Sequence, residues 1–141
     1  MNIDLTLSSL QDKGYRLTKV RIGLVEIFSS ISKPLSANKV EDLLVEKGLI
    51  VNKATIYREL QFLLTNNYLT EIYLSSNEVC YESSELKHHH HLICSTCGNI
   101  DNVTNCLATA LEEDVYKKKG FKIMRHTLEF YGTCSNCLKK A

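Results

Sequence analysis

The residues from His88 to Cys97, HHHHLICSTC, carry the densest group of metal-binding side chains in this chain. Four consecutive imidazoles lead into a Cys-x-x-Cys pair, Cys94 and Cys97, and a second such pair is formed by Cys134 and Cys137. Each short turn presents two thiolates to one ion, and four thiolates complete the tetrahedral shell of zinc. The spacing therefore predicts one structural Zn²⁺ site built from the four cysteines.

The histidine run leads into an apolar segment that we expect to be a strand over residues 89–93. Because alternate side chains of a strand point the same way, His89 and His91 should share one face, and His88 and His90 the other. This geometry can serve two metal sites on opposite faces of the strand. The competing interpretation is a solvated run of histidines, which an internal position before an apolar strand disfavours.

Composition excludes several classes of protein. The chain has 141 residues, a hydrophobic content of 44% and a net charge of +1. No apolar run approaches the roughly 20 residues of a membrane-spanning helix, and the first residues do not resemble a signal peptide, so we expect a cytoplasmic protein without a membrane partner. In a reducing compartment, six cysteines favour metal thiolates over disulfides. The chain offers no nucleophile and no HExxH arrangement, so we expect neither an enzyme nor a small-molecule substrate.

The first part of the chain reads as helices followed by a hairpin. Apolar spacing predicts helices over residues 4–13, 19–30, 36–48 and 53–67, with Thr18, Ser36 and Asn52 as the N-caps of the last three. Two strands, 69–74 and 78–82, should follow, joined by a turn at 75–77. Three helices and a β-hairpin form a winged helix-turn-helix, in which the helix beginning after Asn52 takes the place of the recognition helix.

The second part reads as a small mixed unit after a polar hinge at 83–87. We expect strands at 89–93 and 99–103, a helix at 105–119 and one long strand at 121–132. The fold class is therefore α+β. A unit of this size is too small to be stable without a metal and a partner chain.

The chain closely resembles the ferric uptake regulator (Fur) superfamily of bacterial metal-dependent repressors. The matching segments are GYRLTKVR, ATIYREL, HHHHLICSTCG and HTLEFYGTCSNC, in the order and spacing of the family. The resemblance implies a winged-helix DNA-binding domain over 1–82, a hinge over 83–87 and an α/β dimerisation domain with a four-cysteine zinc site over 88–141. It also implies a homodimer that binds a palindromic double-stranded DNA operator when its regulatory metal is bound. Whether dimers pair into a tetramer is left open.

The resemblance places the regulatory metal at His89 and His91, with Glu82 arriving from the hinge. The chain departs from the iron-type pattern, since Lys33-Pro34-Leu35 stands where a histidine is usual and Asn102 where a carboxylate is usual.

A further candidate ligand is Glu71, near the position from which zinc sensors of the family take one. A shell of Glu71, Glu82, His89 and His91 suits zinc, so zinc sensing is favoured over iron. Imidazole and carboxylate also accept Fe²⁺ or Mn²⁺, and Cys80 could replace a carboxylate. An iron-responsive or peroxide-responsive regulator and a metal-storage or chaperone module are the alternatives.

On the other face, the resemblance aligns His88, His90 and His126 with a further metal site of the family. Its usual acidic member falls at Thr109, so Asp101, Glu112 or Glu113 would have to substitute. Packing or solvent exposure of these histidines is the alternative. Cys80 and Cys106 read as plain thiols.

Two groups of residues are candidates for binding DNA. Those on the recognition helix could read base edges or phosphates, and those before and within the second helix could hold phosphates. The first group is Lys53, Thr55, Tyr57 and Arg58, and the second is Tyr15, Arg16, Lys19 and Arg21. A solvated surface charge is the alternative for each residue taken singly.

Overall fold

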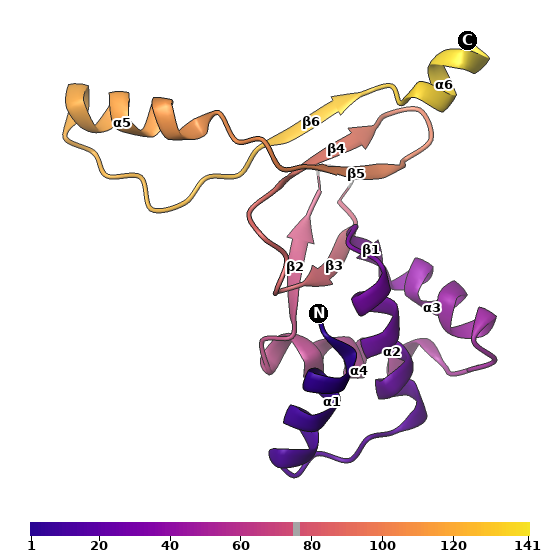
Figure 1. Cartoon of the computed structure of the whole chain (residues 1–141). Helices are drawn as coiled ribbons and strands as arrows, with labels where there is room; N and C mark the ends of the chain where they lie inside the picture. The colour runs from indigo at the N-terminus through magenta and orange to yellow at the C-terminus, as the bar shows by residue number, and fades with distance from the viewer. Residues whose placement is uncertain (75–76) are drawn as a thin grey trace. The chain divides into compact units, whose positions relative to one another are not determined.

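The computed structural model describes residues 1–74 and 77–141 (Figure 1). The chain divides into two compact units, Met1–Leu86 and Lys87–Ala141, and the predicted hinge contains the boundary between them. Among the described residues, every helix is too short or too polar to span a bilayer.

Four helices form the body of the first unit. They are α1 (Ile3–Asp12), α2 (Lys19–Ser30), α3 (Ala37–Glu46) and α4 (Lys53–Thr65). Each begins after a residue whose side chain accepts a hydrogen bond from a backbone N–H of the first turn. The predicted caps Thr18, Ser36 and Asn52 are confirmed, and Asn2 caps α1 in the same way.

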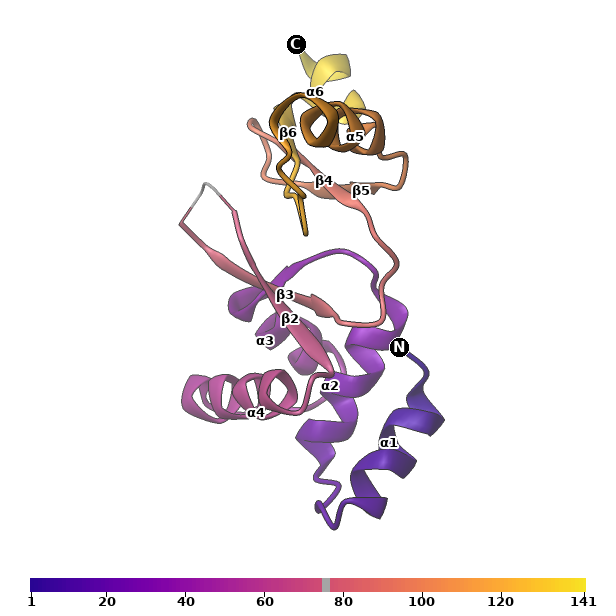
Figure 2. The ribbon, with the colours of Figure 1, turned by 90° about the vertical axis from the view of Figure 1, so that its left-hand side faces the viewer.

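The wing is a three-stranded antiparallel sheet in the order β1-β3-β2, with the helices of the unit on one side of it (Figure 2). Its strands are β1 (Leu35–Ser36), β2 (Leu69–Tyr73) and β3 (Val79–Ser83). The sequence predicted the hairpin but no strand at Leu35–Ser36, because a two-residue strand leaves no periodic signal. Of the predicted turn, Ser75 and Ser76 lie outside the described residues.

The apolar stripes of α2, α3 and α4 meet in one core with residues of α1 and the wing. Leu24, Val25, Val40, Leu44, Leu60 and Leu63 are completely buried. The core cluster consists of Leu10, Leu24, Val25, Ile27, Phe28, Leu35, Ala37, Val40, Leu44, Ile56, Leu60, Leu63, Leu69 and Tyr81.

The second unit is a three-stranded sheet with two helices. Its elements are β4 (His90–Cys94), β5 (Ile100–Val103), α5 (Ala108–Lys119), β6 (Glu129–Gly132) and α6 (Ser135–Lys140). The strand order is β5-β4-β6, in which β4 pairs antiparallel with β5 and parallel with β6. No residue of α5 is buried, and the helix extends away from the sheet in Figure 1.

Two predictions for this unit need correction. The expected strand at 121–132 is confined to Glu129–Gly132, and residues 121–128 have no regular structure. Its alternating pattern has no layer to pack against within one chain, and Phe121 and Met124 remain 65% and 82% exposed. The short helix α6 was missed because six residues carry no measurable helical periodicity.

Candidate metal centres and DNA interface

The four predicted zinc ligands converge at one end of the second sheet. Cys94 ends β4, Cys97 lies in the following turn, and Cys134 and Cys137 come from the start of α6. The parallel pairing of Cys94 with Gly132 brings the two segments together, and the backbone N–H of Ser95 donates to Gly132 O at 2.8 Å. The ligand atoms of all four cysteines lie within 4.8 Å of one another.

The spacing and electrostatics of these sulfurs fit a metal ion. Zinc–sulfur bonds of about 2.3 Å put neighbouring sulfurs of a tetrahedron about 3.8 Å apart, and Sγ of Cys97 and Sγ of Cys134 are separated by 3.8 Å. The backbone N–H of Cys134 donates to Sγ of Cys94 at 3.3 Å and is the main cause that lowers the pKa of Cys94 to about 6. The pKa of Cys137 rises to about 12, chiefly through its hydrogen bond with Cys97. Four thiolates this close together repel one another unless a cation lies between them. The group could therefore hold zinc.

His89 and His91 form a second group on one face of β4. Their Nε2 atoms lie 3.2 Å apart, close to the roughly 3.3 Å between neighbouring nitrogens of a tetrahedral zinc shell. Nδ1 of His89 donates to the carbonyl of Lys87 at 2.7 Å, which fixes the ring and leaves Nε2 as the donor atom for a metal. His91 is buried, with 7% of its surface exposed.

The two carboxylates predicted to join these histidines belong to the wing, in the first unit. Glu82 lies opposite Thr70 and is buried, whereas Glu71 lies opposite Tyr81. Directly opposed residues share a face and neighbouring residues alternate, so Glu71 and Glu82 point to opposite faces of the wing sheet. The hydroxyl of Tyr73 donates to Glu71 at 2.6 Å. The strand register therefore does not bring Glu71 and Glu82 together.

The third group contains a residue that sequence reasoning did not select. His88, His90 and His126 come together as predicted by the resemblance, and the fourth member is Cys106. Asp101 is not part of the group, since it lies on β5 opposite Leu92 and accepts from the backbone N–H of Asn102.

The pKa of His90 is lowered by burial and by the neighbouring histidines. Burial is the main cause that lowers the pKa of His90, and the positive charges of His88 and His126 act in the same direction. The neutral imidazole is the form that binds a metal.

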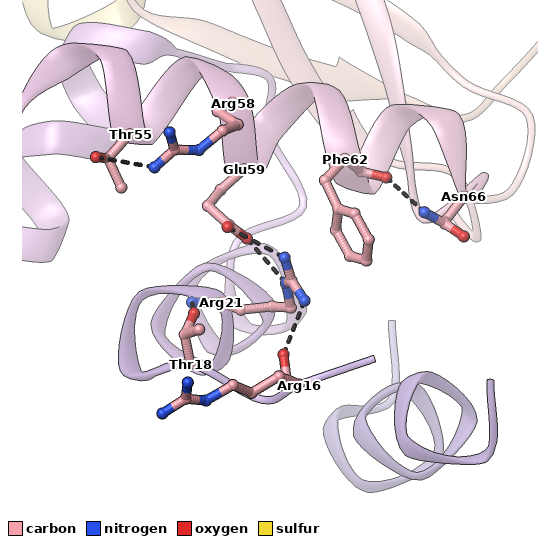
Figure 3. Close-up of polar contacts among 8 residues, drawn as sticks. All are labelled: Arg16, Thr18, Arg21, Thr55, Arg58, Glu59, Phe62 and Asn66. Atoms are coloured by element: carbon pink, nitrogen blue, oxygen red, sulfur yellow. Dashed lines mark hydrogen bonds and ion pairs between the residues drawn. The ribbon is translucent and has the colours of Figure 1, made fainter. Parts of the chain in front are cut away.

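The recognition-helix candidates occupy the exposed side of α4. Lys53, Tyr57 and Arg58 are exposed, and Tyr57 keeps 52% of its surface accessible. Nη2 of Arg58 donates to Oγ1 of Thr55 at 3.5 Å (Figure 3). The opposite side of α4 packs into the core through Ile56, Leu60 and Leu63. One face of the helix is thus left for a partner molecule.

Arg21 forms a buried ion pair within the first unit, which argues against its predicted role as a phosphate-binding residue. Its Nε and Nη2 donate to both oxygens of Glu59, at 2.8 and 3.1 Å, and its Nη1 donates to the carbonyl of Arg16 at 2.8 Å (Figure 3). The guanidinium stacks on Phe62, with Cζ 3.7 Å from the ring centroid. Only 12% of the Arg21 side chain is exposed. A signal was available, because Glu59 stands on the apolar side of α4 next to Leu60, and a buried carboxylate requires a cation.

The other candidates of this group remain on the surface. Arg16 and Lys19 are exposed, and Tyr15 is 38% exposed with its ring packed edge-on against Phe62 at a centroid distance of 4.8 Å. These three residues therefore stay available to a polyanion.

Comparisons with known proteins agree with this fold. The ferric uptake regulator family model matches residues 12–131. The ferric uptake regulation protein of Neisseria meningitidis serogroup B is 30% identical over 135 residues, covering 95% of this chain and 94% of that protein. The zinc uptake regulation protein of Mycobacterium tuberculosis is 31% identical over 124 residues, covering 88% and 95%. The solved Helicobacter pylori ferric uptake regulator superposes with a TM-score of 0.82 at 23% identity, covering 98% and 95%.

The chain belongs to the ferric uptake regulator family. It is accordingly a metal-dependent, DNA-binding transcription regulator and not an enzyme, as the sequence predicted. Iron-named and zinc-named relatives are equally similar to it, so overall identity does not identify the regulatory metal.

Proposed function

We propose that this protein is a cytoplasmic repressor of metal-homeostasis genes, which binds a palindromic operator as a homodimer when a regulatory metal is bound. The observation that carries the proposal is the pair of Nε2 atoms of His89 and His91, 3.2 Å apart, with His89 held by the carbonyl of Lys87. Fixed imidazoles at this separation favour a bound ion over packing alone.

The proposed regulatory shell contains His89, His91 and Glu82. Glu82 is retained because it is a buried carboxylate and a carboxylate oxygen is a common zinc ligand. Glu71 is not retained, because the wing register turns it to the other face. Three protein ligands suit zinc in a four-coordinate site, whereas Fe²⁺ and Mn²⁺ take more oxygen and nitrogen donors. We therefore favour Zn²⁺ as the regulatory metal and keep iron and manganese as arms of the test.

A second copy of the chain is proposed to cover the second unit. This unit exposes many large apolar side chains, and an apolar surface of this kind marks an interaction site. They are Leu92, Leu107, Leu111, Tyr116, Phe121, Met124, Leu128, Phe130, Tyr131 and Leu138. A homodimer buries such a surface and places two recognition helices on the two half-sites of a palindrome.

Metal binding would strengthen DNA binding by lowering its cost in conformational entropy. An ion held by ligands from both units restricts the orientations of the DNA-binding unit, so less conformational entropy is lost when the dimer engages two half-sites. Without the ion, each recognition helix binds its half-site at a larger entropic cost.

The test uses DNA that the metal-loaded protein selects from a pool of random duplexes. Binding is then measured by fluorescence anisotropy with Zn²⁺, anaerobic Fe²⁺ or Mn²⁺, and without a regulatory metal. We expect Zn²⁺ to strengthen binding most. His89→Ala and His91→Ala should remain dimers and lose the strengthening by metal, whereas Arg58→Ala should bind the metal normally and lose DNA affinity.

Two results would contradict the proposal. If His89→Ala and His91→Ala bound DNA with the same metal dependence as the wild type, these histidines would not form the regulatory site. Failure to select any duplex, with metal uptake intact, would favour a storage or chaperone module. If only Fe²⁺ strengthened DNA binding, the regulatory metal would be iron, and the rest of the proposal would be unchanged.

A further inference from the structure

We propose that Cys106 supplies a thiolate ligand to the group of His88, His90 and His126, and that this sulfur makes the site select zinc over harder divalent ions. The proposal goes beyond the regulatory function and does not depend on DNA binding. The resemblance anticipates an acidic ligand at this place. The structure supplies a thiol instead, from a cysteine that no sequence pattern singles out.

The sheet topology explains why Cys106 reaches the histidines. β5 runs antiparallel to β4, and its last residue, Val103, lies opposite His90. The chain therefore leaves the sheet beside His90, and Cys106 follows three residues later, before α5. His126 comes from the segment between α5 and β6. Four ligand atoms from three separate segments lie within 4.8 Å of one another.

The distances around His126 fit donor atoms that share one ion. Its Nε2 lies 3.2 Å from Sγ of Cys106 and 3.1 Å from Nε2 of His88. Neighbouring donors in a tetrahedral nitrogen and sulfur shell are about 3.3 to 3.6 Å apart. Nε2 of His126 therefore lies close to two other ligand atoms at once. A ring nitrogen can accept only one well-aligned hydrogen bond, so hydrogen bonding alone does not account for both contacts.

His90 supplies the observation that separates a metal site from a hydrogen-bonded cluster. Its side chain is buried, with 3% of the residue exposed. Its Nε2 has no hydrogen-bond partner within the part of the chain that the structure describes. A buried ring nitrogen without a partner costs free energy, which a metal ion bound at that atom would remove.

An outer carboxylate completes the arrangement. Nδ1 of His126 donates to Oε1 of Glu112 at 2.6 Å, which leaves Nε2 of His126 as the ligand atom. A carboxylate behind a ligating histidine orients the ring and raises its basicity. Glu112 therefore acts here as a positioning residue behind His126 and not as a direct ligand.

The sulfur ligand determines which metal the site takes. Three imidazoles and one thiolate suit tetrahedral zinc, whereas Mn²⁺ prefers oxygen ligands and a higher coordination number. Replacing the thiolate by a carboxylate should reduce the preference for zinc. Cys106 is thus a specificity-determining residue and not a plain buried thiol.

The test titrates Co²⁺ into full-length protein whose four-cysteine site is filled with Zn²⁺, and follows the sulfur-to-cobalt charge-transfer absorption. We expect the wild type to show this band, and Cys106→Ser to lose it together with more than about tenfold in Zn²⁺ affinity. The matched control is Cys80→Ala, which removes the other cysteine outside the four-cysteine site and should keep the band. His89→Ala should also keep it, which separates this site from the regulatory one.

Two further measurements keep the test independent of folding defects in Cys106→Ser. In the wild type, Zn²⁺ should slow alkylation of Cys106 by iodoacetamide at least about tenfold, read by peptide mass spectrometry. Glu112→Ala should weaken Zn²⁺ binding about 10- to 100-fold while the charge-transfer band remains at saturation. A band that survives in Cys106→Ser, a band lost in Cys80→Ala, or unchanged alkylation of Cys106 would overturn the proposal.

Discussion

The two units of this chain differ in what holds them together. The first unit buries a continuous apolar core, in which Leu24, Val40 and Leu60 are completely shielded from water. Among the described residues of the second unit, Cys94, His90 and His91 are the buried ones, and each is a candidate metal ligand. No residue of α5, the longer of the two helices of that unit, is buried.

The difference shows how a small protein can make DNA binding depend on a metal. A unit with its own core keeps the recognition helix folded at all times, because hydrophobic burial does not require an ion. A unit whose buried positions are filled by metal ligands gains its folding free energy from the ion. We infer that the first unit, which would contact DNA, stays folded without metal, and that the second unit responds to metal.

The largest effect is expected from removing one ligand of the four-cysteine site. Cys97→Ser should unfold most of residues 87–141, because a structural zinc contributes on the order of 10 kcal/mol to folding. Limited proteolysis with mass spectrometry should then find new cleavage sites in that range and few in residues 1–86. Thr96→Ala is the matched control, since Thr96 is exposed in the same turn. Protection of 87–141 in Cys97→Ser would break the comparison.

A smaller effect, confined to the other unit, is expected from Phe28→Ala. Phe28 is 2% exposed in the core of the first unit, and its truncation should cost about 3–5 kcal/mol there. Urea unfolding followed by NMR signals of residues 1–86 measures the change. The counterpart Phe121→Ala, 65% exposed, should change the stability of the first unit by less than about 0.5 kcal/mol. Loss of zinc from Phe28→Ala would mean that the two units do not fold independently.

The smallest effect concerns the ion pair of the first unit. Glu59→Ala leaves the guanidinium of Arg21 buried without its partner and should cost about 3 kcal/mol. The control is Glu26→Ala. Its ion pair with Lys47 has the same 2.8 Å distance but far more exposed side chains, so its loss should cost less than about 1 kcal/mol. Equal losses of folding free energy in Glu59→Ala and Glu26→Ala would show that burial adds nothing to the ion pair of Arg21 with Glu59.

Local patterns in the sequence predicted what local physics determines. Capping side chains and apolar spacing placed α2 and α4, since both signals act within one or two turns. Cysteine spacing predicted the sulfur group that the structure brings together, and strand alternation predicted the separate pairs of histidines. Each of these features depends on residues that are close in sequence.

The missed features depend on contacts between distant residues. Cys106 joins the third group only because β5 ends beside His90. Glu71 lies one residue out of step with Glu82 across the hairpin, and a shift of one residue moves a side chain to the other face. Arg21 reads as a surface cation until Glu59, 38 residues away, is placed next to it. Sequence patterns within one element carry none of this information.

The most direct test of the difference between the units is amide hydrogen exchange of the full chain, with and without metal removal by a chelator under reducing conditions. We expect amides of residues 87–141 to lose most of their protection when the metal is removed, while those of the α2 and α4 core remain protected. Protection of residues 87–141 that survives verified removal of the metal would contradict the account. Loss of protection in both units together would contradict it equally.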